Sequence, residues 1–292
     1  MSLLVKNVNK SFGTKKVVDN LSFELNKPGV FGLLGTNGAG KTTSIRMILG
    51  IIKKDSGEIS FNGKSVTRKN VNFGYLPEER GLYPKSKIYD QLMYFANLKG
   101  MSKVDGDKAI RYWLDKLKVS EYINYTAEKL SKGNQQKIQF ITAVLHNPDL
   151  IVLDEPFSGL DPVNTEILSN VMKELISERK YITMSSHQMN SVEEFCTDLI
   201  ILNRGKTVLK GNLKDIKSSY NSSKVLVETD DNIDSIIKKL KLNILSSNDG
   251  VYIIENSNKD LLKELCDNNI NVSKYEIVKP SLHEIFIEKV GE

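Results

Sequence analysis

Glycines are concentrated in one short segment, Gly35-Thr36-Asn37-Gly38-Ala39-Gly40-Lys41-Thr42, which follows an apolar run. Glycines let a backbone curl so that successive N–H groups converge on one phosphate, and a helix that begins there adds the positive end of its dipole. In such loops the lysine contacts the β- and γ-phosphates and the next hydroxyl ligates Mg²⁺. We therefore predict a nucleotide-phosphate site in which Lys41 binds phosphate and Thr42 binds Mg²⁺. The alternative is a flexible glycine-rich turn. A dinucleotide fingerprint is excluded, because no Gly-x-Gly-x-x-Gly can be read here.

Two adjacent carboxylates, Asp154 and Glu155, follow the apolar run Leu150–Leu153. Side chains alternate along a strand, so these two point in different directions and take different roles. Asp154 is predicted to hold Mg²⁺, usually through water. Glu155 is predicted to act as general base on the attacking water, a role worth about 10² to 10⁴ in rate. The acids could merely cap the next helix, but ligands of such sheets collect at the carboxyl ends of the strands, where the phosphate loop must also lie.

A third segment, Lys129–Gln136, precedes an amphipathic stretch that ends before Pro148. Ser131 followed by Gly133 is typical of the start of an anion-binding helix. Considered alone, this pattern predicts a helix N-cap and nothing more.

Five short apolar runs must form the strands that position these motifs, and amphipathic stretches separate them. Such alternation predicts an α/β fold with a largely parallel sheet. Strands are absent between Ile88 and His146, where the pattern predicts a helical insertion. The predicted strands are Val30–Leu34, Val71–Leu76, Leu150–Leu153, Tyr181–Met184 and Leu199–Leu202.

The character of the chain changes at Ser218–Ser223, a polar and turn-rich stretch that we interpret as a linker between domains 1–217 and 218–292. The patterns after it follow the order β-α-β-β-α-β, which is ferredoxin-like, and a last helix closes the chain. Residues 218–292 contain nine lysines, no arginine and thirteen acidic residues, a net charge of −4, which leaves +9 for residues 1–217. A cationic larger domain suits a polyanionic phosphate ligand, although a solvated basic surface explains the charge equally well.

The composition is that of a globular protein, with 292 residues, 40% of them hydrophobic, and a net charge of +5. This charge argues against a strongly basic nucleic-acid binder, so no nucleic-acid partner is expected. No apolar run approaches the ~18 to 20 residues of a membrane span. Lys6 and Lys10, with no apolar stretch behind them, argue against a secretory signal. Cys196 and Cys266 lie in no zinc or redox spacing. We expect a cytoplasmic protein with reduced cysteines.

These motifs in combination resemble those of the ATP-binding cassette (ABC) family over residues 1 to about 211. The family's Leu-Ser-Gly-Gly-Gln signature stands shortly before its Asp-Glu strand, as Leu130–Asn134 does here. This chain departs from the signature with Lys132 in place of a glycine and Asn134 in place of the glutamine. The resemblance implies an α/β P-loop NTPase cassette fold with a helical insertion at about residues 88–146, followed by a small α+β domain.

Four further positions acquire roles from this resemblance. Ser158–Pro162 looks like the family's D-loop, although it also holds an aspartate and a proline suited to a helix start. His187 resembles the switch histidine that contacts the γ-phosphate, whereas a lone loop histidine is more often inert. Phe12 resembles the aromatic residue that stacks on adenine, with a core residue as the alternative. Glu78 stands where the family has a glutamine, and a carboxylate can ligate Mg²⁺ but cannot donate an N–H group.

The site expected from the sequence has three groups of residues. The catalytic residues are Lys41, Glu155 and His187. The metal ligands are Thr42, Glu78 and Asp154. The nucleotide-binding residues are Phe12, Gly35, Thr36, Asn37, Gly38, Ala39, Gly40, Lys41, Thr42, Thr43, Ser131 and Gly133.

The resemblance implies an ATPase that uses ATP and Mg²⁺. Two cassette chains, expected to be a homodimer, would press ATP between Lys41 of one chain and Ser131 of the other. Without a span of its own, the chain would power a separate transmembrane permease from the inner face of the cell membrane. The C-terminal segment resembles the accessory domain of exporter-type cassette ATPases, where it is regulatory, dimer-supporting or merely stabilising.

Two other classes of protein are weighed against an exporter subunit. Soluble cassette ATPases of translation or DNA repair usually carry two cassettes or a long coiled-coil insertion, and neither is found in this sequence. A P-loop kinase or GTPase would leave Leu130–Gln135 and Ser158–Pro162 unexplained.

Overall fold

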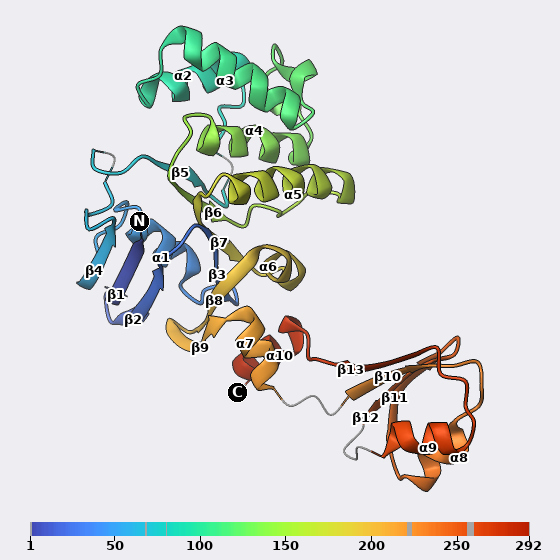
Figure 1. Cartoon of the computed structure of the whole chain (residues 1–292). Coiled ribbons are helices and arrows are strands. Elements are labelled where there is room, and N and C mark those ends of the chain that lie inside the picture. The colour runs from blue at the N-terminus through green and yellow to red at the C-terminus, as the bar shows by residue number, and fades with distance from the viewer. Residues whose placement is uncertain (1, 68, 80, 221–223, 256–259, 292) are drawn as a thin grey trace. The chain divides into compact units, whose positions relative to one another are not determined.

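The computed structural model describes residues 2–67, 69–79, 81–220, 224–255 and 260–291. The chain divides into two compact units, Met1–Leu213 with Lys289–Glu292, and Lys214–Glu288. Figure 1 labels the elements of both units.

The larger unit is built on a nine-stranded sheet with the strand order β4-β1-β2-β9-β8-β3-β7-β6-β5. Strands β8, β3, β7, β6 and β5 are parallel to one another and confirm the five strands predicted from apolar runs. The strands of this sheet are β1 (Leu3–Phe12), β2 (Lys15–Leu25), β3 (Gly29–Gly35), β4 (Ser56–Phe61), β5 (Phe73–Leu76), β6 (Leu150–Asp154), β7 (Tyr181–Ser186), β8 (Cys196–Asn203) and β9 (Lys206–Asn212).

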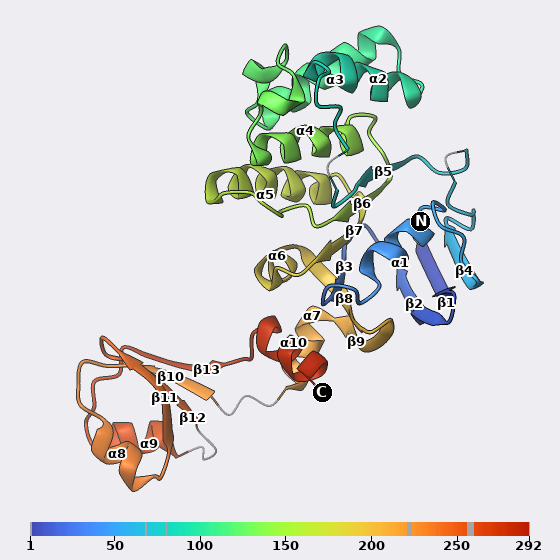
Figure 2. The same cartoon turned by 180° about the vertical axis from the view of Figure 1, so that it is seen from behind.

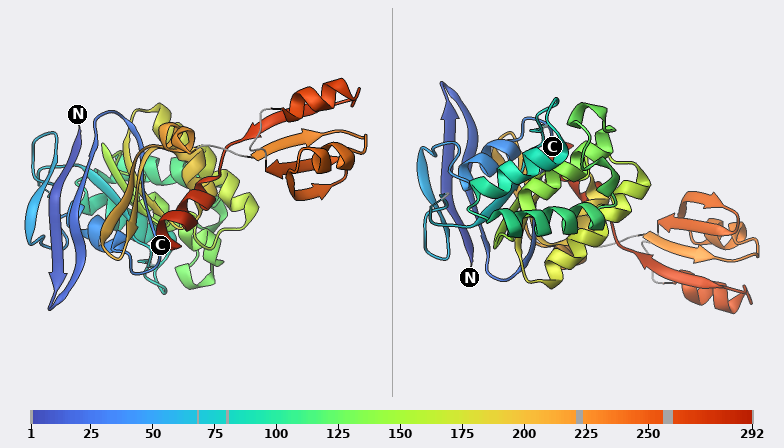
Figure 3. Two further views of the ribbon diagram at one scale, coloured as in Figure 1. Left: turned by 90° about the horizontal axis from the view of Figure 1, so that it is seen from below. Right: turned by 90° about the horizontal axis from the view of Figure 1, so that it is seen from above.

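The sequence analysis did not predict four strands of this sheet: β1, β2, β4 and β9. They form the antiparallel ladders β1–β2, β1–β4 and β8–β9, and Figure 3 shows β1 and β2 side by side at one side of the unit. Parallel strands that are buried on both faces appear as continuous apolar runs, whereas β1 and β2 mix buried and exposed positions and no residue of β9 is buried. The stacked rings of Phe23 and Phe31, with centroids 4.2 Å apart, join β2 to β3 in the core.

The helices of the larger unit surround the parallel strands. Helices α2 and α3 lie beside α4 and α5 at one end of the unit, away from β1, β2 and β4 (Figure 2). Among the described residues between β5 and β6 there is no strand element. The helices are α1 (Lys41–Ile48), α2 (Ile88–Leu98), α3 (Lys103–Lys116), α4 (Lys132–Val144), α5 (Pro162–Ser177), α6 (Met189–Phe195) and the 3₁₀ turns Ser120–Tyr122 and Ala127–Lys129.

The smaller unit contains an antiparallel sheet with the strand order β11-β12-β10-β13. Apolar residues of β10 and β12, such as Val225 and Ile254, pack against Ile237 of α8 and Leu265 of α9. This arrangement confirms the predicted β-α-β-β-α-β order and the ferredoxin-like sheet. Its strands and helices are β10 (Lys224–Glu228), α8 (Asp234–Lys239), β11 (Asn243–Asn248), β12 (Val251–Glu255), α9 (Leu261–Asp267), β13 (Lys274–Val278) and the start of α10 (Leu282–Gly291).

The predicted linker Ser218–Ser223 is partly helical. Ser218 and Ser219 form the end of α7 (Leu213–Ser219), and residues 221–223 lie outside the described residues. Across the described ranges, every helix is too short or too polar to cross a membrane.

Candidate functional site

The glycine-rich segment forms the turn between β3 and α1. Gly40, the residue before α1, has φ +103°, and a Cβ built on it would lie 2.6 Å from the carbonyl oxygen of Val17. Only glycine fits this left-handed backbone against a neighbouring strand. No side chain of the described residues caps the start of α1, so the first-turn N–H groups are left to face a ligand.

Lys41 curls back over this turn. Its Nζ donates to the carbonyl oxygen of Gly35 at 2.8 Å and to that of Thr36 at 3.4 Å. The same Nζ lies 3.9 Å from Oε1 of Glu155, and both residues are buried. The first two predicted motifs therefore meet at one point, where a buried cation faces a buried carboxylate.

Asp154 is fully buried at the end of β6. Its Oδ1 accepts a short hydrogen bond from the Ser185 hydroxyl, whereas its Oδ2 has no hydrogen-bond partner among the described residues. Burial raises the pKa of Asp154, the hydroxyls of Ser185 and Thr42 oppose that shift, and the carboxylates of Glu78 and Glu155 add to it. A buried carboxylate oxygen without a donor, close to a hydroxyl and further acids, is suited to a hard cation.

Glu155 occupies an uncommon backbone conformation for a residue with a side chain, with φ +53°. Its N–H group donates to the carbonyl oxygen and to Oγ of Ser185, each at 3.2 Å. Its Oε2 lies 2.8 Å from Nδ1 of His187 and accepts from the His187 backbone N–H at 3.3 Å. The strained turn thus aims the Glu155 carboxylate between Lys41 and His187.

Two further predicted residues lie at the ends of neighbouring strands. Glu78 follows β5, is exposed, and lies close enough to influence the pKa of Asp154. Phe12 ends β1 with 51% of its surface exposed, and Nζ of Lys10 lies 5.2 Å from its ring centroid. Phe12 is therefore not a core residue, and its ring is free to stack on a flat ligand.

Ser131 and Gly133 lie at the start of α4, as predicted. Ser131 is the N-cap, because its Oγ accepts from the N–H of Asn134 at 3.3 Å. A Cβ on Gly133 would lie 3.2 Å from Nδ2 of Asn164, so the start of α4 packs against the start of α5, which Asp161 caps. Within the described residues of this one chain, no hydrogen bond or ion pair joins Ser131 or Gly133 to the cluster around Lys41.

The remaining turn residues differ in exposure. Ala39 is buried, while Thr36, Asn37 and Gly38 are exposed and Thr43 is half-buried. A Cβ on Gly38 would meet open space, although its φ is +78°. The exposed part of the turn is the part that can contact a ligand from solvent.

Magnesium chemistry fits these residues only together with a bound phosphate. The described residues hold no cluster of three or more His, Cys, Asp or Glu that could bind a metal by itself. Mg²⁺ usually keeps several waters and takes one or two protein groups plus substrate phosphates. Thr42, Asp154 and Glu78 could supply such a partial set.

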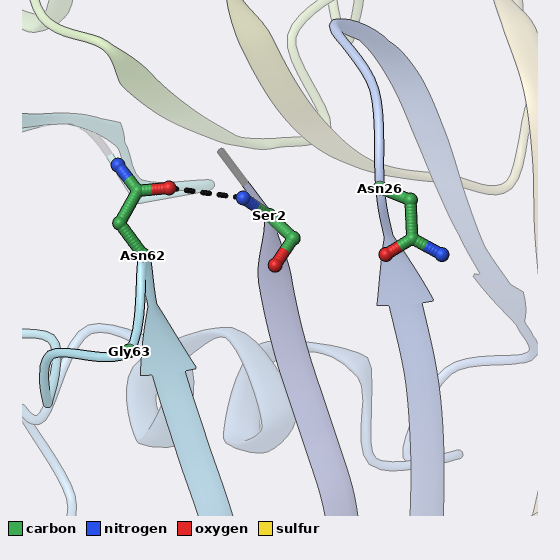
Figure 4. Close-up of a pocket in the computed structure, with 4 residues that line it drawn as sticks. All are labelled: Ser2, Asn26, Asn62 and Gly63. Atoms are coloured by element: carbon green, nitrogen blue, oxygen red, sulfur yellow. Dashed lines mark hydrogen bonds between the residues drawn. The ribbon is translucent and has the colours of Figure 1, made fainter.

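An open hollow of about 620 Å³ lies elsewhere on the larger unit. It is lined by Ser2, Asn26, Asn62 and Gly63, and the N–H of Ser2 donates to Oδ1 of Asn62 at 2.9 Å (Figure 4). Ser2 precedes β1 and Phe12 ends it, so about 30 Å of strand separates the hollow from Phe12. The hollow takes no part in the cluster around Lys41.

Comparison with known proteins decides the family. A curated relative from Bacillus subtilis (strain 168), the uncharacterized ABC transporter ATP-binding protein YhaQ, is 46% identical over 99% of this chain and 98% of its own length. The chain belongs to the ABC transporter ATP-binding proteins. The family model described as ABC transporter matches residues 18–158. A solved structure described as the ATP binding subunit of an ABC transporter covers 75% of this chain and 93% of its own, with 29% identity and a TM-score of 0.69.

The smaller unit of this cassette protein has a family of its own. A model described as the C-terminal domain of DrrA1-3-like ATP-binding proteins matches residues 211–290. The linearmycin resistance ATP-binding protein LnrL of Bacillus subtilis (strain 168) is 28% identical over 99% of this chain and 98% of its own length. The cassette protein is an ATPase of a family that hydrolyses ATP to power transport, and the expected resemblance is confirmed.

The sequence analysis did not identify two residues of this ABC cassette that contact the candidate site. Ser185 holds both Asp154 and Glu155, and the only signal was a serine pair after a buried strand. Gln139 of α4 holds the backbone around Glu78. No local pattern distinguishes it from an ordinary helical glutamine.

Proposed function

We propose that the chain is the ATP-hydrolysing subunit of an ABC exporter and that Glu155 is its general base. The observation that carries this proposal is the cluster in which the buried Glu155 carboxylate lies between Lys41 and His187, beside an unpartnered oxygen of Asp154. A carboxylate within reach of a phosphate-binding lysine is placed to accept a proton from water at the γ-phosphate.

The proposed mechanism begins with the exchange of partners at Lys41. In the free chain Lys41 is held by backbone carbonyls of its own turn and by Glu155. The β- and γ-phosphates of ATP would draw Lys41 away and leave Glu155 to orient water. The water oxygen then attacks the γ-phosphorus as Glu155 takes the proton, and the bond from phosphorus to the bridging oxygen breaks to release ADP. Bound Mg²⁺, held by Thr42, Asp154 and Glu78, would neutralise phosphate charge.

His187 and Phe12 complete the proposed nucleotide site. His187 is half-exposed and contacts Glu155, so the same ring can turn to the γ-phosphate. Phe12 offers a half-exposed ring for the adenine base, an interaction worth about 1 to 3 kcal/mol.

We propose that two chains form a dimer around ATP. Ser131 and Gly133 lie at the start of a helix of thirteen residues, where the Ser131 Oγ accepts from the N–H of Asn134 in the first turn. A second chain could offer its bound γ-phosphate to this helix start, where backbone N–H groups favour anions. Closure of the dimer would then depend on the γ-phosphate, and hydrolysis would release it.

A separate permease is the proposed membrane partner, because no described helix of this chain could cross a membrane. Tyr83 and Tyr94 support a docking face beside the Glu78 loop: they are 52% and 50% exposed, with ring centroids 6.5 Å apart. Exposed aromatic pairs are common at protein interfaces. The chain would then sit on the inner face of the membrane. The export direction is supported by a relative that is 32% identical over 70% of this chain and is named a Nod factor export ATP-binding protein. The translation and DNA-repair alternative has no comparable support.

Replacement of Glu155 by Gln tests the proposed base. The variant keeps the side-chain shape and should still bind ATP, but its ATPase rate should fall by at least about 10²-fold. The control is Glu166→Gln on the exposed face of α5, which should keep the wild-type rate. An ATPase rate of Glu155→Gln near that of the wild type rejects Glu155 as the base.

Mixed dimers test the shared site. Ser131→Arg and Lys41→Ala should each be inactive alone, whereas a mixture should recover part of the activity, because one of the two sites in a mixed dimer is intact. No recovery in a mixture that demonstrably dimerises would contradict the sharing of sites.

A further inference from the structure

Gln139 is a buried residue of α4 whose amide group is fully used by one loop. Its Nε2 donates to the carbonyl oxygen of Pro77 at 3.1 Å and to that of Glu79 at 2.9 Å. Its Oε1 accepts from the N–H of Gly81 at 3.2 Å. The side chain is only 2% exposed, so these three bonds satisfy an amide that would be costly to bury without partners.

The two carbonyl groups that Gln139 holds belong to the residues on either side of Glu78. Glu78 itself is exposed, and its carboxylate acts on the pKa of the buried Asp154. Gln139 therefore holds the backbone on both sides of the residue that we assign to the Mg²⁺ site. In strand β5 the backbone is held by its neighbour β6, but that ladder ends at Leu76 and Leu153. Beyond Leu76, hydrogen bonds from the Gln139 side chain hold the backbone instead.

The same helix also reaches the other acid-bearing segment. Gln136 lies three residues before Gln139, and its Nε2 donates to the carbonyl oxygen of Pro156 at 3.1 Å, directly after Glu155. Residues three apart share one face of a helix. Helix α4 thus contacts the loop of Glu78 and the loop of Glu155 at once. Its N-cap Ser131 lies eight residues from Gln139, about 12 Å along a rigid helix.

We propose that Gln139 is a positioning residue that fastens the Glu78 loop to α4, so that Glu78 moves with this helix rather than with β5. This inference rests on the proposed function, which assigns Ser131 to the nucleotide of a partner chain and Glu78 to Mg²⁺. Displacement of the helix start by a γ-phosphate is then transmitted through Gln139 to the metal site. The bonds of Gln139 act in the nucleotide-free chain as well, so they can be tested separately from hydrolysis.

Hydrogen–deuterium exchange of the nucleotide-free chain tests the fastening itself. Gln139→Met keeps a similar side-chain volume and removes all three bonds. The Gly81 amide should then exchange about two- to tenfold faster, the factor for one net hydrogen bond. The matched control is Gln91→Met in α2. Gln91 is equally buried and holds the next part of the same loop, through the N–H of Tyr83 and the carbonyl of Ser86, each at 3.2 Å.

In the control the Gly81 amide should keep its wild-type exchange rate. Unchanged Gly81 exchange in Gln139→Met, or equal acceleration in both variants, would overturn the inference. Should Gln139→Met fail to fold, Gln139→Ser is measured in the same way.

The Mg²⁺ dependence of the ATPase tests whether loss of the Gln139 hydrogen bonds weakens Mg²⁺ binding. In Gln139→Met the Mg²⁺ concentration for half-maximal rate should rise roughly tenfold or more, as for outer partners of metal ligands. The KM for ATP at saturating Mg²⁺ should stay near the wild-type value, and Gln91→Met should show neither change. Loss of a purely structural residue would not raise the Mg²⁺ requirement while leaving the KM for ATP unchanged. Equal Mg²⁺ dependence in both variants therefore contradicts the inference. A wild-type chain without ATPase activity would instead reject the proposed function, and Gly81 exchange would still decide the fastening.

Discussion

His146 is expected to make the larger unit less stable in mild acid. Its Nε2 lies 3.0 Å from the carbonyl oxygen of Phe73, which can only accept, so Nε2 carries the proton. Its Nδ1 is buried and has no hydrogen-bond partner in the parts of the chain that the structure describes. Burial, and then the nearby Lys99 ammonium, lowers the pKa of His146 from 6.5 to about 4. Protonation of Nδ1 would place a charged N–H where nothing accepts it.

The sign and size of the effect follow from linkage. Because the folded state binds the proton less well than the unfolded state, the contribution of His146 is complete above pH 6.5 and is lost as the pH falls toward 4. For pKa values of 6.5 and about 4, the free energy of unfolding falls by about 2 kcal/mol between pH 7.5 and 5. The ring keeps some solvent contact, so we expect about 1 to 2 kcal/mol.

Urea unfolding of the wild type and of His146→Gln at pH 7.5, 6 and 5 measures the contribution of His146 to the free energy of unfolding. The glutamine can still donate to the Phe73 carbonyl but does not titrate. Trp113 of α3, the single tryptophan, reports the larger unit by fluorescence. Other titrating groups are common to both proteins and cancel in the difference. If both proteins lose the same stability between pH 7.5 and 5, the neutral burial of His146 contributes nothing and the reasoning is wrong.

Three further outcomes are expected. Phe12→Ala should raise the KM for ATP about five- to 150-fold with little change in kcat, because only adenine stacking is removed; an unchanged KM in steady-state assays would assign the ring elsewhere. Gly40→Ala should lower the melting temperature and abolish binding of an ATP analogue, because its Cβ would lie 2.6 Å from the Val17 carbonyl oxygen; wild-type binding and stability would contradict the turn geometry. Ser281→Ala should cost about 1 kcal/mol of unfolding free energy, because Ser281 Oγ accepts from the Glu284 N–H at 3.2 Å and Glu284 Oε2 from the Ser281 N–H at 2.8 Å; chemical denaturation with an unshifted midpoint would speak against this cap.

The elements of the site that could be predicted were those encoded by neighbouring residues. The glycine turn before Lys41 and the acids after Leu153 each carry their own chemistry in a few consecutive positions. The parallel strands could be predicted because burial on both faces requires continuous apolar runs. The antiparallel strands could not, because β2, for example, presents polar residues to solvent between its buried ones.

The amino-acid sequence by itself determined which groups are available: a phosphate-binding turn, two adjacent acids, a helix start with a serine and a smaller β-α-β-β-α-β unit. Only the tertiary structure decided which of them meet. The contacts of Glu155 with Lys41 and His187, of Asp154 with Ser185, and of Gln139 with the Glu78 loop join residues from separate strands and helices. Such contacts depend on how the elements pack, and local sequence carries no record of a distant partner.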